Sequence, residues 1–130
     1  ITKRKNRTTA QVVALSGDLG SGKTTFTKEL AAEIGVTENV ASPTFVIERV
    51  YPIDLDGFKN LIHIDAYRME KDEDILMLGW KDQIENKEKI IFIEWPEIVS
   101  GAIPSDALRI NFEHGDGEDQ RIITIENGKD

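Results

Sequence analysis

The sequence predicts an α/β domain whose core sheet is largely parallel, with antiparallel hairpins added to it. Two short apolar runs, at residues 12–15 and 90–93, have the length and unbroken hydrophobicity of strands buried on both faces. A segment of helical periodicity lies between them, at residues 23–34. Because buried strands separated by helices are typical of sheets covered on both faces, the pattern favours a three-layer sandwich.

The predicted helix at residues 23–34 is amphipathic and has a defined end. One of its faces carries only apolar side chains, those of Phe26, Leu30, Ala31 and Ile34. Gly35 follows, and glycine readily takes the left-handed conformation with which many helices end. We therefore expect this helix to pack on the sheet and to stop before Gly35.

Two pairs of strand-like segments are expected to form antiparallel hairpins. Residues 46–51 and 61–64 are rich in β-forming side chains, and the turn between them would contain Asp54, Asp56 and Gly57. Residues 108–112 and 121–125 alternate in polarity on either side of a turn-rich loop. These hairpins are the antiparallel additions to the parallel core.

A short helix is expected over residues 72–78. Asp72 would cap its N-terminus, because an aspartate side chain accepts hydrogen bonds from the free N–H groups of a first turn. The side chains expected to pack inward are those of Ile75, Leu76 and Leu78. Pro96 would prevent the apolar run at 90–93 from continuing as a strand.

Composition favours a single domain over the 130 residues and excludes several classes of protein. The chain has no cysteine, so disulfides and thiolate metal sites are impossible. No apolar run approaches the roughly 20 residues of a membrane-spanning helix, and residues 1–11 lack the apolar stretch of a signal peptide, so we expect a cytoplasmic protein. The net charge of −8 opposes non-specific binding to DNA or RNA.

A glycine-rich segment joins the first strand to the first helix. It reads Gly17-Asp18-Leu19-Gly20-Ser21-Gly22-Lys23-Thr24, which fits the pattern G-x-x-x-x-G-K-[ST]. In such a loop the backbone N–H groups form a concave anion site at a helix N-terminus. Lys23 would add a positive charge at the β- and γ-phosphates, and the Thr24 hydroxyl is a hard oxygen ligand for Mg²⁺. The segment predicts a nucleoside triphosphate as ligand, namely ATP with Mg²⁺.

Nothing in the sequence selects guanine as the base. The segment Asn86-Lys87-Glu88-Lys89 resembles a guanine-reading motif but lacks its final aspartate. Asp54-Leu55-Asp56-Gly57 matches a string found in GTPases, yet it lies in a predicted turn, where aspartate and glycine are expected anyway.

Two residues after the buried run at 90–93 are candidates to complete the site. Glu94 fits the position of a carboxylate that holds the metal or polarises water, although a solvated strand-end glutamate has the same sequence pattern. Trp95 follows it, and two interpretations are open. The indole would either lie next to the nucleotide or pack half-buried in the core.

Two further polar segments lie near other predicted strand ends. Asp65 could orient the attacking water and Arg68 could meet a phosphate, but taken alone these residues favour a strand end with a capping aspartate. In Ser42-Pro43-Thr44-Phe45, Thr44 could sense the γ-phosphate and the metal as part of a switch loop. An ordinary turn is the simpler interpretation of that segment.

These motifs together resemble the TsaE (YjeE) family, the small bacterial ATPases of tRNA threonylcarbamoyladenosine synthesis. In chain order they are the glycine-rich segment extended to Thr25, Ser42-Pro43-Thr44-Phe45, His63-Ile64-Asp65-Ala66-Tyr67-Arg68 and Ile93-Glu94-Trp95-Pro96-Glu97. The first motif is shared by many nucleoside triphosphatases, whereas the last three are much more specific in this order and spacing. The resemblance covers residues 12–97, about two-thirds of the chain.

The resemblance implies the fold of a P-loop nucleoside triphosphatase and an ATPase that works with two partners, TsaD and its homologue TsaB. ATP hydrolysis would reset that complex between rounds of tRNA modification, and any contact with tRNA would come through the complex. The residues carried over are catalytic Asp65 and Glu94, metal-binding Thr24 and Glu94, and nucleotide-binding residues 18–25, Thr44 and Trp95. The family's amphipathic helix before the first strand has no counterpart in residues 1–11, which are few and polar.

Two other functions fit a phosphate-binding loop. A small-molecule kinase needs an acceptor pocket and usually an arginine-bearing lid, and no arginine-rich insertion follows the later helix. A non-catalytic scaffold would bind ATP only to control assembly. Hydrolysis measured with and without partners separates the ATPase from the scaffold.

Overall fold

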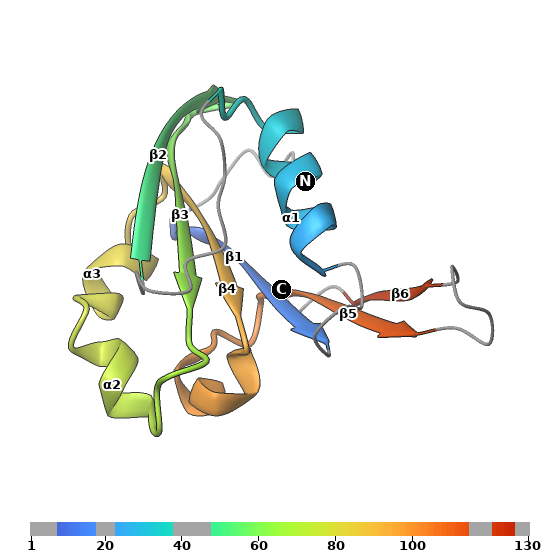
Figure 1. The fold of residues 1–130 in the computed structure, drawn as a ribbon. Helices are drawn as coiled ribbons and strands as arrows, with labels where there is room; N and C mark the ends of the chain where they lie inside the picture. The colour runs from blue at the N-terminus through green and yellow to red at the C-terminus, as the bar shows by residue number, and fades with distance from the viewer. Residues whose placement is uncertain (1–7, 18–22, 38–47, 115–120, 127–130) are drawn as a thin grey trace.

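A computed structural model describes residues 8–17, 23–37, 48–114 and 121–126. At its centre is a six-stranded sheet with the strand order β2-β3-β4-β1-β5-β6 (Figure 1). The four inner strands run parallel: β3 (Phe58–Asp65), β4 (Lys89–Glu94), β1 (Gln11–Gly17) and β5 (Leu108–His114). The two edge strands pair antiparallel with their neighbours: β2 (Glu48–Leu55) and β6 (Arg121–Glu126). The predicted α/β class, with a largely parallel core and antiparallel hairpins, is confirmed.

Helices cover both faces of this sheet, which gives the predicted three layers (Figure 1). On one face lies α1 (Lys23–Glu33), whose Ala31 is buried among side chains of β1, β3 and β4. On the other face lie α2 (Asp72–Leu76), α3 (Trp80–Ile84) and the 3-10 helix η1 (Pro96–Ala102). Because successive residues of a strand point to opposite faces, each inner strand contributes to both apolar layers.

The central strands are buried as their composition predicts. In β4 the four residues Ile90, Ile91, Phe92 and Ile93 are fully buried, with alternate members in the two apolar clusters. β1 lies between β4 and β5 and buries Val12, Val13, Ala14 and Leu15 in the same way. A strand in that position has no edge exposed to solvent, which explains why its run is apolar without alternation.

The first helix ends where glycine predicts. Gly35 takes a φ of 106°, which favours glycine over residues with a side chain. Its N–H donates to the carbonyl of Ala32 at 3.2 Å, and the N–H of Val36 donates to the carbonyl of Ala31 at 3.0 Å. These two bonds satisfy carbonyls of the last turn, in the arrangement of a glycine-terminated helix.

Both predicted hairpins are present, but Asp54, which was predicted to lie in the first turn, belongs to strand β2. β2 and β3 pair from Glu48↔Ile64 to Leu55↔Phe58 around a turn at Asp56 and Gly57, with φ values of 47° and 92°. Positive φ at both turn residues is the geometry that suits the twist of a tight hairpin. β5 and β6 pair from Arg109↔Glu126 to His114↔Arg121. The first residues of the segment predicted at 46–51, Val46 and Ile47, lie outside the described residues.

A helix is present in the segment 72–78, but the prediction for it is wrong in three respects. It ends at Leu76, and Gly79, with a φ of 73°, separates it from α3, which the sequence analysis did not anticipate. Asp72 does not cap it; Asp74 does, because its Oδ2 accepts from the N–H groups of Glu70 at 2.8 Å and Lys71 at 3.3 Å.

The third error concerns which side chains of this segment face the core. Ile75 is fully buried and Leu78 packs against the core, as predicted, but Leu76 is 50% exposed. A helix of five residues turns little more than once, so it can bury few of its side chains against one face. No helix in the described part of the chain has the length and apolar character needed to cross a membrane.

Candidate functional site

The carboxyl ends of three parallel strands bring the predicted acids to one edge of the sheet. In the strand register, Asp65 at the end of β3 lies beside Glu94 at the end of β4. Glu94 in turn lies beside Leu15 of β1, two residues before Gly17, where the glycine-rich segment begins. In open α/β sheets, ligands bind at this carboxyl edge.

The glycine-rich segment is flanked as its motif requires. β1 leads into it and ends at Gly17, and α1 begins at Lys23 directly after it. Thr25 lies in the first turn of α1 and is exposed. The other predicted phosphate-loop residues, at positions 18–22, lie outside the described residues, as do Thr44 and the side chains of Lys23 and Thr24.

A buried pair of polar side chains lies at the end of β4. Glu94 is only 4% exposed and His63 of β3 only 2%. The His63 Nε2 lies 2.6 Å from the Glu94 Oε2, within hydrogen-bonding distance. Both side chains belong to the sheet face that α1 covers, because Leu61 and Phe92, two residues before each of them, pack in that layer.

Asp65 has the capping contact that its position at a strand end suggested. Its Oδ1 accepts a hydrogen bond from the N–H of Tyr67 at 2.9 Å, which closes the turn after β3. Asp65 is partly exposed, whereas Glu94 beside it is buried. Arg68 also follows this turn and is exposed. The cap is a structural role for Asp65, and a role in catalysis stays a prediction.

Trp95 takes an unusual backbone conformation directly after Glu94. Its φ of 60° and ψ of 48° place it in the left-handed region, although residues before proline normally adopt extended conformations. Strain of this kind, of order 1–3 kcal/mol, tends to cluster at functional sites. The indole is partly buried against the core and lies 5.2 Å from the ring of Tyr67, measured between ring centroids.

An open depression of about 590 Å³ lies between Trp95 and the beginning of the glycine-rich segment. It is lined by Ser16, Gly17, Trp95, Glu97 and residues 111–113 near the end of β5. Trp95 therefore has the predicted half-buried packing, and its position next to a nucleotide stays a prediction. It packs half-buried against the core and also borders the edge at which the phosphate segment starts.

Comparison with known proteins identifies the family. The family model described as "Threonylcarbamoyl adenosine biosynthesis protein TsaE" matches residues 2–123. The chain belongs to the TsaE family. The TsaE protein of Bacillus subtilis is 40% identical over 114 residues, which cover 88% of this chain and 68% of that protein. The TsaE protein of Borreliella burgdorferi is 41% identical over 98 residues, covering 75% of this chain and 69% of that protein.

A solved structure supports the same fold for this member of the TsaE family. The crystal structure of Bacillus subtilis YdiB superposes with a TM-score of 0.69 at 30% sequence identity. The superposition covers 93% of this chain and 70% of that chain.

Sequence reasoning missed one residue of this TsaE site, His63. It stands two residues before Asp65, so on a strand the two side chains share a face. That spacing was the available signal, but the partner of His63 lies 31 residues further along the chain. Only the pairing of β3 with β4 brings His63 to Glu94.

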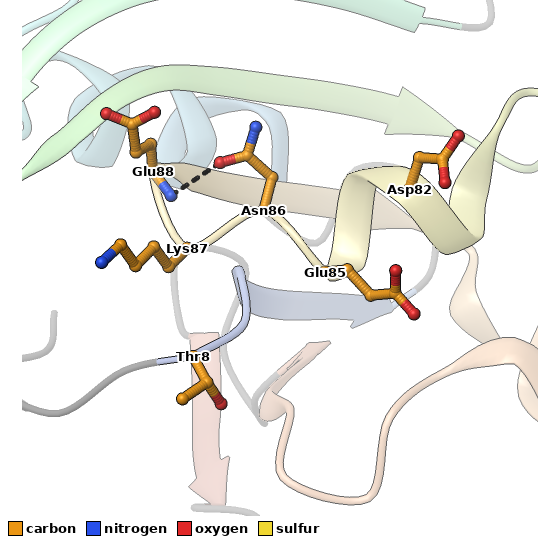
Figure 2. A pocket seen from close by; sticks show the side chains of 6 residues that line it. All are labelled: Thr8, Asp82, Glu85, Asn86, Lys87 and Glu88. Atoms are coloured by element: carbon orange, nitrogen blue, oxygen red, sulfur yellow. Dashed lines mark hydrogen bonds between the residues drawn. The ribbon is translucent and has the colours of Figure 1, made fainter.

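A second depression, of about 440 Å³, lies at the opposite edge of the sheet (Figure 2). It is lined by Thr8, Asp82, Glu85, Asn86, Lys87 and Glu88, which precede the beginnings of β1 and β4. The N–H of Glu88 donates to Asn86 Oδ1 at 2.9 Å, and the acidic side chains point apart rather than toward a common centre. The segment that resembles a guanine-reading motif thus lies at the far edge from the phosphate segment, which agrees with its rejection.

Proposed function

We propose that this member of the TsaE family is an ATPase that binds ATP with Mg²⁺ and hydrolyses it. Its turnover supports a complex of TsaB and TsaD homologues in the threonylcarbamoyladenosine modification of tRNA. The single observation that carries the proposal is the meeting of β1, α1, Asp65 and Glu94 at one carboxyl edge. We place the protein in the cytoplasm, and any contact with tRNA is made through the complex.

In this proposal, the backbone of residues 18–25 and the Lys23 ammonium bind the phosphates of ATP. Asp65 accepts a hydrogen bond from the attacking water and orients it, and hydrolysis yields ADP and inorganic phosphate. Thr44 belongs to a loop that responds to the γ-phosphate, and Trp95 borders the nucleotide. TsaB and TsaD complete the catalytic arrangement, so that hydrolysis by the isolated chain is slow.

The residues available fit a magnesium ion bound together with nucleotide. Mg²⁺ prefers oxygen ligands and is usually held by one or two carboxylates together with phosphates and water. Glu94 and the Thr24 hydroxyl offer such oxygens. No cluster of three or more histidine, aspartate or glutamate side chains that could hold a metal occurs within the described residues. When bound, the ion would offset negative charge on the phosphates. The affinity of the protein for Mg²⁺ should therefore be higher when ATP is bound.

The proposed function is tested by measuring ATP hydrolysis with and without purified TsaB and TsaD. We expect slow hydrolysis by the isolated chain and clear stimulation by the two partners together. Hydrolysis that stays at background with both partners, while ATP still binds, would favour the non-catalytic scaffold. Phosphoryl transfer to a small acceptor molecule would instead favour the kinase.

Trp95 should report nucleotide binding through its fluorescence. Because the indole borders the depression next to Gly17, ATP or ADP should change its emission. Trp80 is the other tryptophan of the chain and lies fully buried on the α2–α3 face, with its Nε1–H donating to the Ala102 carbonyl at 2.9 Å.

Two variants assign the fluorescence signal to one of the tryptophans. The nucleotide-dependent change should persist in Trp80→Phe and disappear in Trp95→Phe. Circular dichroism should accompany the measurement, because Trp80→Phe removes a hydrogen bond worth about 1 kcal/mol. A folded Trp80→Phe that binds nucleotide without any change in emission would show that Trp95 lies away from the nucleotide.

A further inference from the structure

Glu94 needs a hydrogen-bond donor because of where it lies. It is 4% exposed, at the end of a strand whose preceding residues are all apolar. A carboxylate removed from water is costly unless it is paired or hydrogen-bonded.

His63 supplies a donor to that carboxylate. In the tautomer that carries its hydrogen on Nε2, the imidazole donates to Oε2 across this 2.6 Å contact, and an ionised carboxylate accepts it. The other ring nitrogen, Nδ1, is also buried, and it has no hydrogen-bond partner among the residues that the structure describes. Among the described residues, the imidazole therefore makes its side-chain hydrogen bond through Nε2, to Glu94.

The sheet holds this pair in a fixed geometry. His63 lies beside Phe92 in the parallel ladder, so Glu94, two residues further along β4, is its diagonal neighbour on the same face. Both residues lie in paired inner strands rather than in loops, and side chains on such elements are held more precisely. The imidazole therefore restricts which way the carboxylate can turn.

We propose that His63 is a positioning residue for Glu94. The contact of its Nε2 with Oε2 fixes the orientation of the carboxylate, so that the other oxygen points in a constant direction toward the metal side of the nucleotide. This inference rests on the proposed function and deepens it. His63 itself touches neither nucleotide nor metal in this scheme, and it acts only through Glu94.

Two amide substitutions distinguish the hydrogen bond made by Nε2 from the presence of any polar side chain at position 63. In His63→Gln the side-chain NH₂ reaches the position of Nε2 and can donate to Glu94. In His63→Asn the NH₂ stops near the position of Nδ1 and cannot. Both variants are polar and uncharged, so they form a matched pair.

We expect His63→Asn to lower kcat for partner-stimulated ATP hydrolysis by about 10- to 100-fold, the usual effect of losing a partner of a metal ligand. KM should change little, because the phosphate loop supplies most contacts to bound ATP. His63→Gln should retain kcat within about threefold of the wild type, since it keeps the donor. Thermal melting, measured on all variants, reports any structural cost separately.

A binding measurement gives a readout that does not depend on turnover. The affinity for ATP is titrated in the presence of Mg²⁺ and again in EDTA, and the ratio of the two Kd values is compared. The gain from Mg²⁺ is the factor by which Mg²⁺ lowers the Kd for ATP relative to EDTA. We expect this gain to be smaller in His63→Asn than in the wild type, and close to the wild-type value in His63→Gln. In a Glu94→Gln background, His63→Asn should change kcat hardly at all, because a residue that acts through Glu94 is silent without it.

The results that would overturn the inference are distinct from those that would overturn the ATPase. Folded His63→Asn with wild-type kcat and a wild-type gain from Mg²⁺ would overturn the positioning role alone. So would a folded His63→Gln whose kcat falls at least about 10-fold below that of the wild type, and that result stands even if His63→Asn melts too low for assay. A wild-type chain that fails to hydrolyse ATP with its partners would overturn the proposed function, while the Mg²⁺ ratios would still test the contact with Glu94.

Discussion

Lys23→Ala is expected to abolish ATP binding at ordinary nucleotide concentrations. Lys23 begins α1 directly after the glycine-rich segment, where its ammonium would meet the β- and γ-phosphates. Removing one partner of such a charge pair costs about 2–5 kcal/mol, which raises Kd by about 30- to 5,000-fold. Titration with a fluorescent ATP analogue measures this loss directly.

Lys28→Ala is the matched control for that experiment. Lys28 lies on the same helix and is exposed, so its removal should leave both Kd and the melting temperature close to those of the wild type. The comparison separates a specific phosphate contact from a general change in charge. An unchanged Kd in Lys23→Ala would remove the phosphate-binding role of this segment and, with it, the proposed function.

The buried core of this fold could be predicted from short apolar runs. Residues 90–93 are all apolar because β4 has a paired strand on each side and a helical layer over each face. The glycines at positions 35 and 57 were equally informative, since each takes a positive φ at the end of an element or in a turn. In these cases local chemistry and the final structure agree.

The region after β3 could not be predicted in the same way, because long-range packing decides it. Trp80 is buried, and its indole N–H donates to the Ala102 carbonyl, 22 residues further along the chain. That contact anchors α3, whose five residues carry no strong helical pattern of their own. Leu76 is exposed, which the periodicity of residues 72–78 did not indicate.

The candidate site shows the same division between local and long-range signals. Asp65 and Glu94 could be chosen from sequence because each stands at the end of a strand-like run. Their adjacency, and the contact of His63 with Glu94, depend on β3 lying next to β4, and the order of strands in the sheet is not written in local sequence. The resemblance to the TsaE family supplied candidate residues but not this pairing.

Asp65→Ala should bind ATP but lose the hydrolysis that TsaB and TsaD stimulate. In the proposed mechanism, Asp65 orients the attacking water, and a positioned general base typically contributes 10²- to 10⁴-fold. ATP affinity should change little, because the phosphate loop supplies most of the ground-state contacts. Hydrolysis with both partners present and multiple-turnover tRNA modification are measured together.

The capping bond from the Tyr67 N–H to Asp65 Oδ1 offers a different explanation for any loss, and Asp65→Asn separates the two. Asparagine keeps an acceptor oxygen for that N–H but replaces the other oxygen by an NH₂ group, which cannot accept the hydrogen bond of the attacking water. Alanine removes both and should also cost about 1 kcal/mol of folding stability. We therefore expect both variants to lose stimulated hydrolysis by at least about 100-fold, and only Asp65→Ala to melt at a lower temperature. If Asp65→Asn instead turns over like the wild type, Asp65 merely closes the turn after β3, and the water must be oriented by another residue of the complex.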